Sequence, residues 1–418
     1  MKKEKDNILL EDYTKLKKIG DGGYATVYKV RHNELEYIRA IRVLKENVDD
    51  EDDPVYKKFI SECKVLLRLG NGNHPNIVHI YQPLFKAGKA FVEMDYITGE
   101  DIKLYIERVR LAPIKEVIRF VKEIASALAY CHVDIYKYCY DREIDNLEDD
   151  PEDGTKPLID ERTRLRLIEK YQVIHNDIHS GNIMRREDGH YILLDFGLSI
   201  QNGEIIRKSQ RTNGAPEYKS PEKWENDSVV STQSDIYSFG VVLYEMLTGH
   251  VPFVFNKDIP PIEAEYELQN AHKMSQPNPV EKEREKTYDS IYGGNYQNDI
   301  PEWLIKVVGK CLSKKIADRY ANGRELYDFI LLNHEAEPTP PIEQVQPPTE
   351  PNRSKGYVLL RERKYMEAKR IFATEQNFPM AEICTELIRL ERKKKNASIT
   401  QNQQERLDTL YKEYDINV

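Results

Sequence analysis

The chain has 418 residues and a formal net charge of −9, because 71 acidic residues outnumber 62 basic ones. This length allows two or more domains, and the negative balance argues against a protein dedicated to binding nucleic acid. Five scattered cysteines without a CxxC pair indicate neither a disulfide framework nor a zinc site, and the lack of an apolar run of about 18 residues predicts no membrane span.

The first residues, MKKEKDNILLEDY, are charged and lack the apolar segment of a signal peptide. The scattered cysteines favour a reducing compartment. We therefore expect a cytoplasmic protein.

Residues 13–97 are expected to form a small, β-rich N-terminal lobe. Five segments have the composition and alternation of strands, and one segment, 55–70, has helical periodicity. The predicted strands are YTKLKKIG (13–20), TVYKVRH (26–32), YIRAIRVL (37–44), IVHIYQPLF (77–85) and KAFVEMDYI (89–97).

From residue 98 to 333 the pattern predicts a larger, helical lobe. A helix is expected over 113–132, where a proline stands near the start and apolar residues recur at helical spacing. Further helices are expected over 234–249 and 301–312, the first of them as a buried core helix. The predicted fold class is therefore α+β, with a small helical module after the second lobe.

An insertion of about 133–172 separates the helix that is expected to end near His132 from the next motif. Within it, residues 141–161 contain ten acidic and two basic residues, which predicts a solvated excursion. A helix is expected over 160–172. A docking or regulatory role of this insertion is the alternative to a solvated loop.

The C-terminal part is expected to be a linker followed by a helical module. Residues 335–354 hold six prolines, which predicts a linker with polyproline II character. Residues 355–418 have helical periodicity, and they match one tetratricopeptide-like helix pair at Gly356, Tyr365, Ala368 and Phe372. Because one repeat cannot bury its own apolar face, we expect a helical hairpin that docks on a protein partner.

The segment IGDGGYATVYKV (19–30) places three glycines, Gly20, Gly22 and Gly23, between two predicted strands. Glycines allow backbone amides to approach phosphates closely, although a hairpin turn also favours glycine. Val27 would follow on the second strand as an apolar cover for a base.

The segment VIHNDIHSGNIM (173–184) is more specific. Asp177 and Asn182 lie five residues apart, and Asp195 follows an apolar strand in ILLDFGLS. An aspartate in such a loop can orient a hydroxyl or accept its proton, and amide and carboxylate oxygens are ligands for Mg²⁺. This set therefore predicts the metal side of a phosphoryl-transfer site.

Taken in chain order, these motifs resemble those of the eukaryotic-like Ser/Thr protein kinase family, over residues 13–333. Further matching segments are HPNIV (74–78), FVEMDY (91–96), GAPEYKSPE (214–222), SDIYSFG (234–240) and ADRY (317–320). The resemblance implies a two-lobe protein kinase fold. It also implies an enzyme that transfers the γ-phosphoryl group of ATP, with Mg²⁺, to Ser or Thr hydroxyls of protein substrates.

The resemblance implies roles for single residues. Asn182 and Asp195 hold Mg²⁺, and Asp177 orients the acceptor hydroxyl. Arg42, on a strand, and Glu62, on the following helix, anchor the phosphates. The residues expected around ATP are Ile19, Gly20, Gly22, Gly23, Val27, Ala40, Arg42, Met94, Asp95, Tyr96, Ile97 and Met184.

Three supporting contacts are implied as well. Glu222 is expected to form a salt bridge with Arg319. Asp235, on the buried helix, is expected to hold the backbone of the catalytic loop. His175 is expected to pack beneath Phe196 as part of the core, and not to act as an acid or base.

Arg42 departs from the family pattern, which has lysine at this strand position. The guanidinium keeps the positive charge, but it is planar and bulkier than an ammonium group, so altered or slower transfer is expected. Lys45 cannot substitute, because it lies at an odd offset from Arg42 and points to the other face of the strand.

The catalytic loop departs from the pattern at two positions. Asn176 stands where the family often has an arginine that pairs with a phosphorylated activation loop, so phosphate-driven activation is not expected. His179 stands where Ser/Thr kinases usually carry lysine, and Ala215 replaces the threonine that usually contacts that lysine. Because the two positions touch in the family, their joint change predicts a rewired contact.

Two other functions stay open. An ATP-binding pseudokinase, acting as a scaffold or allosteric partner, is the first alternative, because Arg42 replaces the lysine. A small-molecule kinase is the second, because HNDIHSGN (175–182) also resembles the catalytic loop of aminoglycoside and choline kinases. The segments around Glu222, Asp235 and Arg319 favour a protein kinase.

Overall fold

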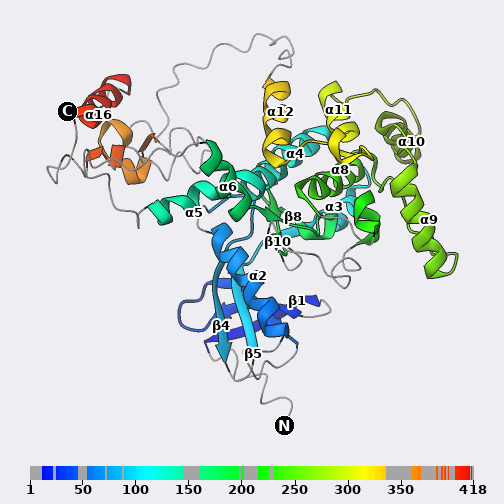
Figure 1. Ribbon diagram of the computed structural model, residues 1–418, viewed down its shortest axis with the longest axis horizontal. Coiled ribbons are helices and arrows are strands. Elements are labelled where there is room, and N and C mark those ends of the chain that lie inside the picture. Colours follow the sequence, from blue (N-terminus) through cyan, green and yellow to red (C-terminus); the bar gives the residue numbers. More distant parts are fainter. Residues whose placement is uncertain are drawn as a thin grey trace. The chain divides into compact units, whose positions relative to one another are not determined.

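The structure is a computed structural model of residues 1–418, in which the chain forms two compact units, 1–337 and 338–418 (Figure 1). The described residues are 12–21, 25–45, 54–70, 73–86, 89–144, 161–196, 199–201, 215–225, 230–335, 359–368, 383–384, 387–388, 390–391, 394, 401–414 and 416. In the first unit a β-rich lobe precedes a helical lobe, which confirms the predicted α+β fold class.

The small lobe contains one antiparallel sheet with the strand order β1-β2-β3-β5-β4. Its strands are β1 (Tyr13–Asp21), β2 (Ala25–His32), β3 (Ile38–Leu44), β4 (Ile80–Lys86) and β5 (Lys89–Asp95), and helix α2 (Pro54–Gly70) lies between β3 and β4 in the chain. All five predicted strands and the predicted helix are present. Apolar residues of the sheet, such as Leu44 and Val92, share a core with Phe59 and Cys63 of α2.

The register of this sheet determines which side chains share a face. β3 lies between β2 and β5, so that Arg42 pairs with Val27 on one side and with Val92 on the other. Directly paired residues point to the same face of a sheet, and so do residues two apart on one strand. Ala40 and its partner Met94 therefore lie on the same face as Arg42.

The large lobe is built around helix α8 (Thr232–Thr248), which is buried along almost its whole length, as the sequence predicts. The surrounding helices are α3 (Ile102–Val109), α4 (Ile114–Ala129), α9 (Pro261–Met274), α10 (Val280–Tyr292), α11 (Glu302–Cys311) and α12 (Gly323–Glu335). Short strands complete the lobe: β6 (Gly99–Asp101), β7 (Val173–Ile174), β8 (Ile183–Arg186), β9 (Tyr191–Leu193) and β10 (Ile200–Gln201). The loops that precede and follow β8 and β9 carry the predicted catalytic residues.

The helix that was expected to end near His132 continues beyond it, so that prediction is wrong. A π-helical turn, η2 (Tyr130–Asp134), joins α4 to α5 (Ile135–Ile144), and α6 (Glu161–Tyr171) packs against α5. The physical reason is that apolar contacts persist, because Tyr136 and Cys139 are buried in the same core as Leu167. The helix expected over 160–172 is present as α6, whereas residues 145–160 lie outside the described part of the chain.

The second unit has a core of its own. Tyr365 and Ala368 are buried in it together with Leu410 of α16 (Gln401–Glu413). Tyr365 and Tyr411 both donate hydrogen bonds to the Glu391 carboxylate, at 2.7 and 2.6 Å. Helix α16 thus shares a core with residues of the predicted helix pair, and a protein partner of this module stays a prediction. Gly356 and Phe372 lie outside the described residues.

Among the residues that the structure describes, no helix is both long enough and apolar enough to cross a membrane.

The packing of α12 against α4 gives a stability prediction. A Cβ on Gly323 would lie 2.3 Å from the backbone of Leu128 and 2.5 Å from that of Ala129, so Gly323→Ala must displace the backbone of one of the two helices. We expect a loss of about 1–3 kcal/mol in the free energy of unfolding, measured by chemical denaturation.

The matched control is Gly309→Ala in α11, where an added Cβ meets no described atom within 4 Å. Alanine is the better helix former, so this variant should be more stable by about 0.5–1 kcal/mol. Equal denaturation midpoints for the two variants would contradict the packing of α12.

Candidate active site

Arg42 and Asp195 meet between the two lobes. The Arg42 guanidinium lies 3.7 Å from Asp195 Oδ1, and the Asp195 side chain is 47% exposed. Asp195 has a φ of 49°, in the left-handed region that few residues other than glycine adopt. Burial raises the pKa of Cys63 on α2 to about 12, and the nearby Arg42 charge opposes this shift. Arg42 is therefore close to α2, to its own sheet and to the Asp195 segment at once.

Glu62 immediately precedes Cys63 on α2. Its side chain is outside the described part of the structure, so the Arg42–Glu62 pair stays a prediction. Lys45 forms an ion pair with Asp21 of β1 at 2.8 Å. This contact agrees with the expectation that Lys45 points away from the face that carries Arg42.

Asp177 and Asn182 are held together within the catalytic loop. The Asn182 side-chain amide donates to the backbone oxygen of Asp177 at 2.9 Å and to its carboxylate at 3.2 Å. With its nitrogen used in this way, the amide directs its oxygen away from Asp177. The Leu194 amide donates to the backbone oxygen of Asn182 at 2.8 Å. This bond ties the loop to the residue just before Asp195, so the three predicted residues come together.

Asp235 of α8 holds the backbone of this loop, as predicted. Its carboxylate accepts the amide protons of His175 at 2.6 Å and of Asn176 at 2.8 Å. Asp235 is only 1% exposed, and burial raises its pKa, but its hydrogen bonds and the neighbouring histidines outweigh that effect and lower the pKa overall. Asn176 has a φ of 67°, a strained backbone conformation that these bonds help to maintain.

His132 is a further partner of Asp235. Its Nδ1 accepts the amide proton of Gly323 at 2.9 Å, so the other nitrogen carries the proton and donates to Asp235 at 3.1 Å. His132 lies in η2, the turn that the sequence does not predict. It links the start of α12 to the catalytic loop.

His175 packs in the core, as expected. Its ring centroid lies 4.5 Å from that of Phe196. Its Nε2 lies 2.8 Å from the backbone oxygen of Leu194, and its Nδ1 accepts the amide proton of Asp177 at 3.3 Å. Both ring nitrogens are therefore engaged with backbone, which supports a structural role and not acid–base chemistry.

His179 lies beside Asp177 and Tyr218. Its Nδ1 accepts the amide proton of Gly181 at 3.1 Å, and its Nε2 lies 3.8 Å from the Asp177 carboxylate. Burial lowers the pKa of His179, although the Asp177 carboxylate opposes the shift, so the neutral imidazole is favoured. Tyr218 donates to Glu245 of α8 at 2.7 Å, and its hydroxyl lies 2.8 Å from that of Ser180. These contacts join residues 215–225 to the catalytic loop.

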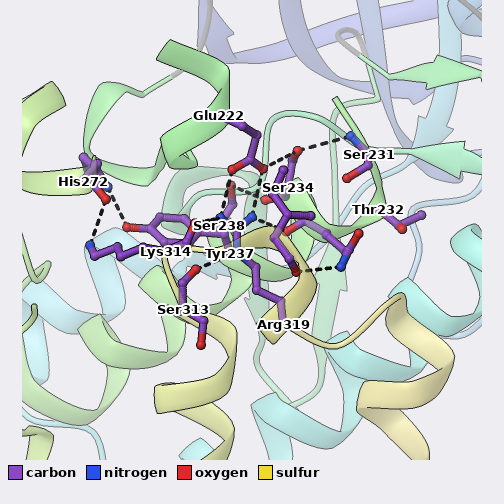
Figure 2. A network of polar contacts seen from close by, with 12 residues as sticks. Glu222, Ser231, Thr232, Ser234, Tyr237, Ser238, His272, Ser313, Lys314 and Arg319 are labelled. Carbon is purple, nitrogen blue, oxygen red and sulfur yellow. Dashed lines mark hydrogen bonds and ion pairs between the residues drawn. The ribbon is translucent and has the colours of Figure 1, made fainter. Parts of the chain in front are cut away.

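Glu222 and Arg319 form the predicted salt bridge (Figure 2). The two guanidinium nitrogens donate to the two carboxylate oxygens at 2.9 Å each, and Ser234 of α8 donates to the same carboxylate at 2.8 Å. Burial raises the pKa of Glu222, but the bonds from Arg319 outweigh burial and lower it overall. This buried pair fixes the end of residues 215–225 to the large lobe.

Five of the residues expected around ATP lie on one face of the small-lobe sheet. Gly20 pairs with Val27, which pairs with Arg42, while Ala40 pairs with Met94. The other expected residues are Ile19 at the end of β1, Met184 on β8, and Asp95, Tyr96 and Ile97 after Met94. Gly22 and Gly23 lie outside the described residues.

The side chains of Asp95 and Tyr96 are engaged by the sheet. Tyr81 donates to the Asp95 carboxylate at 2.7 Å, and the Lys29 ammonium lies 4.1 Å from the centre of the Tyr96 ring. The backbone amide of Asp95 donates to the backbone oxygen of His79 at 3.0 Å. Any contact of this turn with adenine would therefore be made by backbone groups that these interactions do not use.

Lys223 also belongs to the catalytic-loop region, and the sequence alone does not single it out. Its ammonium donates to the backbone oxygen of Asn176 at 2.7 Å, and the residue is buried. The contact joins positions 47 residues apart in the chain. A lysine after the SPE motif would by itself be expected at the surface.

The oxygen atoms of Asn182 and Asp195 fit a Mg²⁺ ion, which prefers such donors and usually completes its coordination with phosphate oxygens and water. In the described ranges, no group of three or more His, Cys, Asp and Glu side chains forms a metal cluster. These residues offer two protein ligands, and the remaining coordination positions would be filled by phosphate oxygens of the substrate and by water.

The chain matches known proteins over most of its length. The family model of the protein kinase domain matches residues 13–139 and 163–327. A probable serine/threonine-protein kinase of Clostridium acetobutylicum is 28% identical over 324 residues, which are 77% of this chain and 40% of that protein. Probable serine/threonine-protein kinase PknB of Lactococcus lactis is 26% identical over 321 residues, 76% and 41% of the two chains. The chain spans about two fifths of the length of these relatives.

The buried pair of Glu222 and Arg319 gives a pH-dependent prediction. Arg319→Met leaves the Glu222 carboxylate buried without its partner, and we expect a loss of about 3–5 kcal/mol in the free energy of unfolding at pH 7. Because the pair lowers the pKa of Glu222, its stabilisation is present above the ordinary pKa of 4.5 and is lost as the pH falls below it. The difference between wild type and variant should therefore be largest above about pH 5 and shrink as the pH falls below 4.5.

The control is Lys306→Met, which removes an exposed ion pair with Glu302 on α11. Its denaturation midpoint should match that of the wild type at every pH. A penalty for Arg319→Met that stays constant with pH would contradict the assignment of the effect to the Glu222 charge.

Proposed function

The chain belongs to the protein kinase family, and we propose that it transfers the γ-phosphoryl group of ATP to Ser or Thr hydroxyls of protein substrates, using Mg²⁺. The observation that supports this proposal most is the joint placement of Asp177, Asn182 and Asp195 on hydrogen-bonded segments. The names of the relatives, which are serine/threonine-protein kinases, favour the same acceptor class.

Asp177 is proposed to orient the acceptor hydroxyl and to accept its proton. The Asn182 amide donates to one Asp177 carboxylate oxygen, which fixes the carboxylate and leaves its other oxygen for a hydroxyl. The side chain is partly exposed, so an acceptor can reach it. The carboxylate therefore combines a fixed direction with access.

Asn182 and Asp195 are proposed to hold the Mg²⁺ ion, which would neutralise charge on the phosphates. Asp195 has a left-handed backbone, and Arg42 of the small lobe approaches its carboxylate to 3.7 Å. By holding the ion, these two residues would orient the phosphates, while Asp177 would orient the acceptor hydroxyl.

Arg42 is proposed to supply the positive charge that the family usually takes from lysine. It lies on the same face as Val27 and Ala40, and its guanidinium is permanently charged. Its contact with Asp195, at 3.7 Å, is an ion pair longer than a hydrogen bond, which puts the guanidinium beside a proposed Mg²⁺ ligand.

The same contact supports the second candidate function, an ATP-binding pseudokinase. A guanidinium that remains on Asp195 competes with a metal ion for that carboxylate and would allow nucleotide binding without transfer. Lysine, a smaller donor with a rotatable ammonium group, would compete less. The substitution Arg42→Lys therefore separates the two functions.

The arrangement of residues 215–225 favours a protein acceptor over a small molecule. This segment is fixed by Glu222 and by Tyr218 beside the catalytic loop, and it provides a firm surface next to Asp177. A small metabolite would need no such platform. ATP turnover that is stimulated by a metabolite, and not by proteins, would support the small-molecule alternative.

We predict that the full chain transfers radiolabelled phosphate from ATP to a generic Ser/Thr-containing protein. Asp177→Asn removes the proton acceptor while keeping the shape of the side chain, and transfer should fall by about 10²- to 10⁴-fold. Asp195→Asn should abolish it, because a neutral amide replaces the charged metal ligand. The measurement is the initial rate of incorporation at saturating Mg²⁺ and ATP.

The matched control is Asp188→Asn, which changes an exposed carboxylate that is paired with Arg186 in the turn after β8. It should transfer at the wild-type rate. If only Arg42→Lys transfers, the natural protein is a silenced kinase. ATP-dependent thermal stabilisation without transfer by any variant would establish the pseudokinase.

A further inference from the structure

Lys223 is a buried lysine without a carboxylate in hydrogen-bond contact among the described residues. It lies in the short turn η5 (Pro221–Trp224) and is 8% exposed. Its ammonium donates to the backbone oxygen of Asn176 at 2.7 Å. Burying an amine is unfavourable unless its surroundings compensate, so a lysine at this place requires an explanation.

Asn176 is held from both sides of its backbone. Asp235 accepts its amide proton at 2.8 Å, and Lys223 donates to its carbonyl oxygen. The residue between these bonds has the left-handed φ of 67° and is followed directly by Asp177. A strained backbone persists only where its surroundings hold it, and here two buried groups of opposite charge do so.

The charges around Lys223 favour its ammonium form. Burial lowers the pKa of Lys223 overall, and the carboxylates of Asp235, Asp177 and Glu222 offset part of that shift. Glu222 is already bound by both nitrogens of Arg319.

The catalytic loop itself supplies little positive charge near Asp177. Asn176 and His179 stand at the two positions where related kinases usually carry arginine and lysine. Burial favours the neutral form of His179. In this chain, the cation that contacts the catalytic loop is Lys223, which comes from a different element, the turn after the SPE motif.

We propose that Lys223 is a positioning residue that clamps the Asn176 carbonyl, fixes the direction of Asp177 and couples residues 215–225 to the catalytic loop. The inference rests on the proposed function, because the residue that it positions is the proposed proton acceptor. Any movement of the segment that withdraws Lys223 releases the loop, so the clamp joins the substrate-facing segment to the catalytic aspartate.

The test uses the full chain and the variant Lys223→Met, which keeps the length of the side chain and removes its charge and donor. We expect kcat for phosphoryl transfer to fall about 10- to 100-fold, because small displacements of a reacting group have effects of this size. The KM for ATP should stay within about twofold, because Lys223 belongs to the large lobe and most of the proposed ATP residues belong to the small-lobe sheet.

Lys314→Met is the matched control (Figure 2). Lys314 is a partly buried lysine that donates to a backbone oxygen, that of His272 at 2.8 Å, and burial lowers its pKa to about 8. This variant should lose stability and keep kcat. The two lysine variants are compared by their loss of kcat for a given loss of stability, measured as the denaturation midpoint. If this ratio is equal in both variants, Lys223 has a merely structural role and the proposal is overturned.

Hydrogen exchange of the backbone amides in 173–184 gives a readout that does not depend on activity. Lys223→Met should accelerate exchange in this loop specifically, and Lys314→Met should not. Unchanged exchange and unchanged kcat in Lys223→Met would overturn the proposal. If the wild type does not transfer phosphate, the proposed function is refuted. If loop exchange is nevertheless faster in Lys223→Met and not in Lys314→Met, the clamp is supported.

A conservative variant guards against loss of folding. Lys223→Arg keeps the charge and the donors, and it should retain more kcat than Lys223→Met. If Lys223→Met does not fold, Lys223→Gln replaces it as the neutral variant, with the same expected fall in kcat. Equal kcat in the glutamine variant and in the wild type would contradict the clamp.

Discussion

The carboxylate of Asp235 is the group on which the rest of the site depends. It is buried in the central helix of the large lobe and binds the amides of His175 and Asn176. His132, from the turn between α4 and α5, donates to the same carboxylate and accepts the amide proton of Gly323 at the start of α12. One charge therefore joins four segments that are far apart in the chain. The packing of these four segments around Asp235 stabilises the strained backbone of Asn176, the residue before Asp177.

From this anchor a short series of contacts leads to the nucleotide side. Asn182 binds Asp177 and accepts the amide proton of Leu194, and Asp195 follows directly. Arg42 approaches Asp195 from the small lobe. In the proposed function, the position of the sheet relative to the catalytic loop would decide how the guanidinium charge is divided between phosphate and the carboxylate. Arginine makes this division more sensitive to geometry than lysine would, because its donors form a fixed fork.

Much of this arrangement could be predicted from the sequence, since it depends on local patterns. The alternation of apolar and polar residues predicted the strands, and the order of short motifs predicted the buried pair of Glu222 and Arg319. The continuation of the helix past His132 was missed, because tyrosines and charged residues in α5 hide the few positions that are buried. The role of Lys223 could not be found at all. It depends on a contact between distant segments, and no local pattern distinguishes this lysine from one at the surface.

The central claim is that buried charges of the large lobe, and not a phosphate on the activation segment, hold the catalytic loop in place. The most direct test compares initial rates of phosphoryl transfer for the full chain before and after complete dephosphorylation, with intact mass as the check and the phosphatase removed. The account predicts equal rates, because Asn176 offers no cation to a phosphate while Asp235 and Lys223 hold its backbone in either state. A fall of tenfold or more on dephosphorylation, reversed by preincubation with ATP, would contradict it.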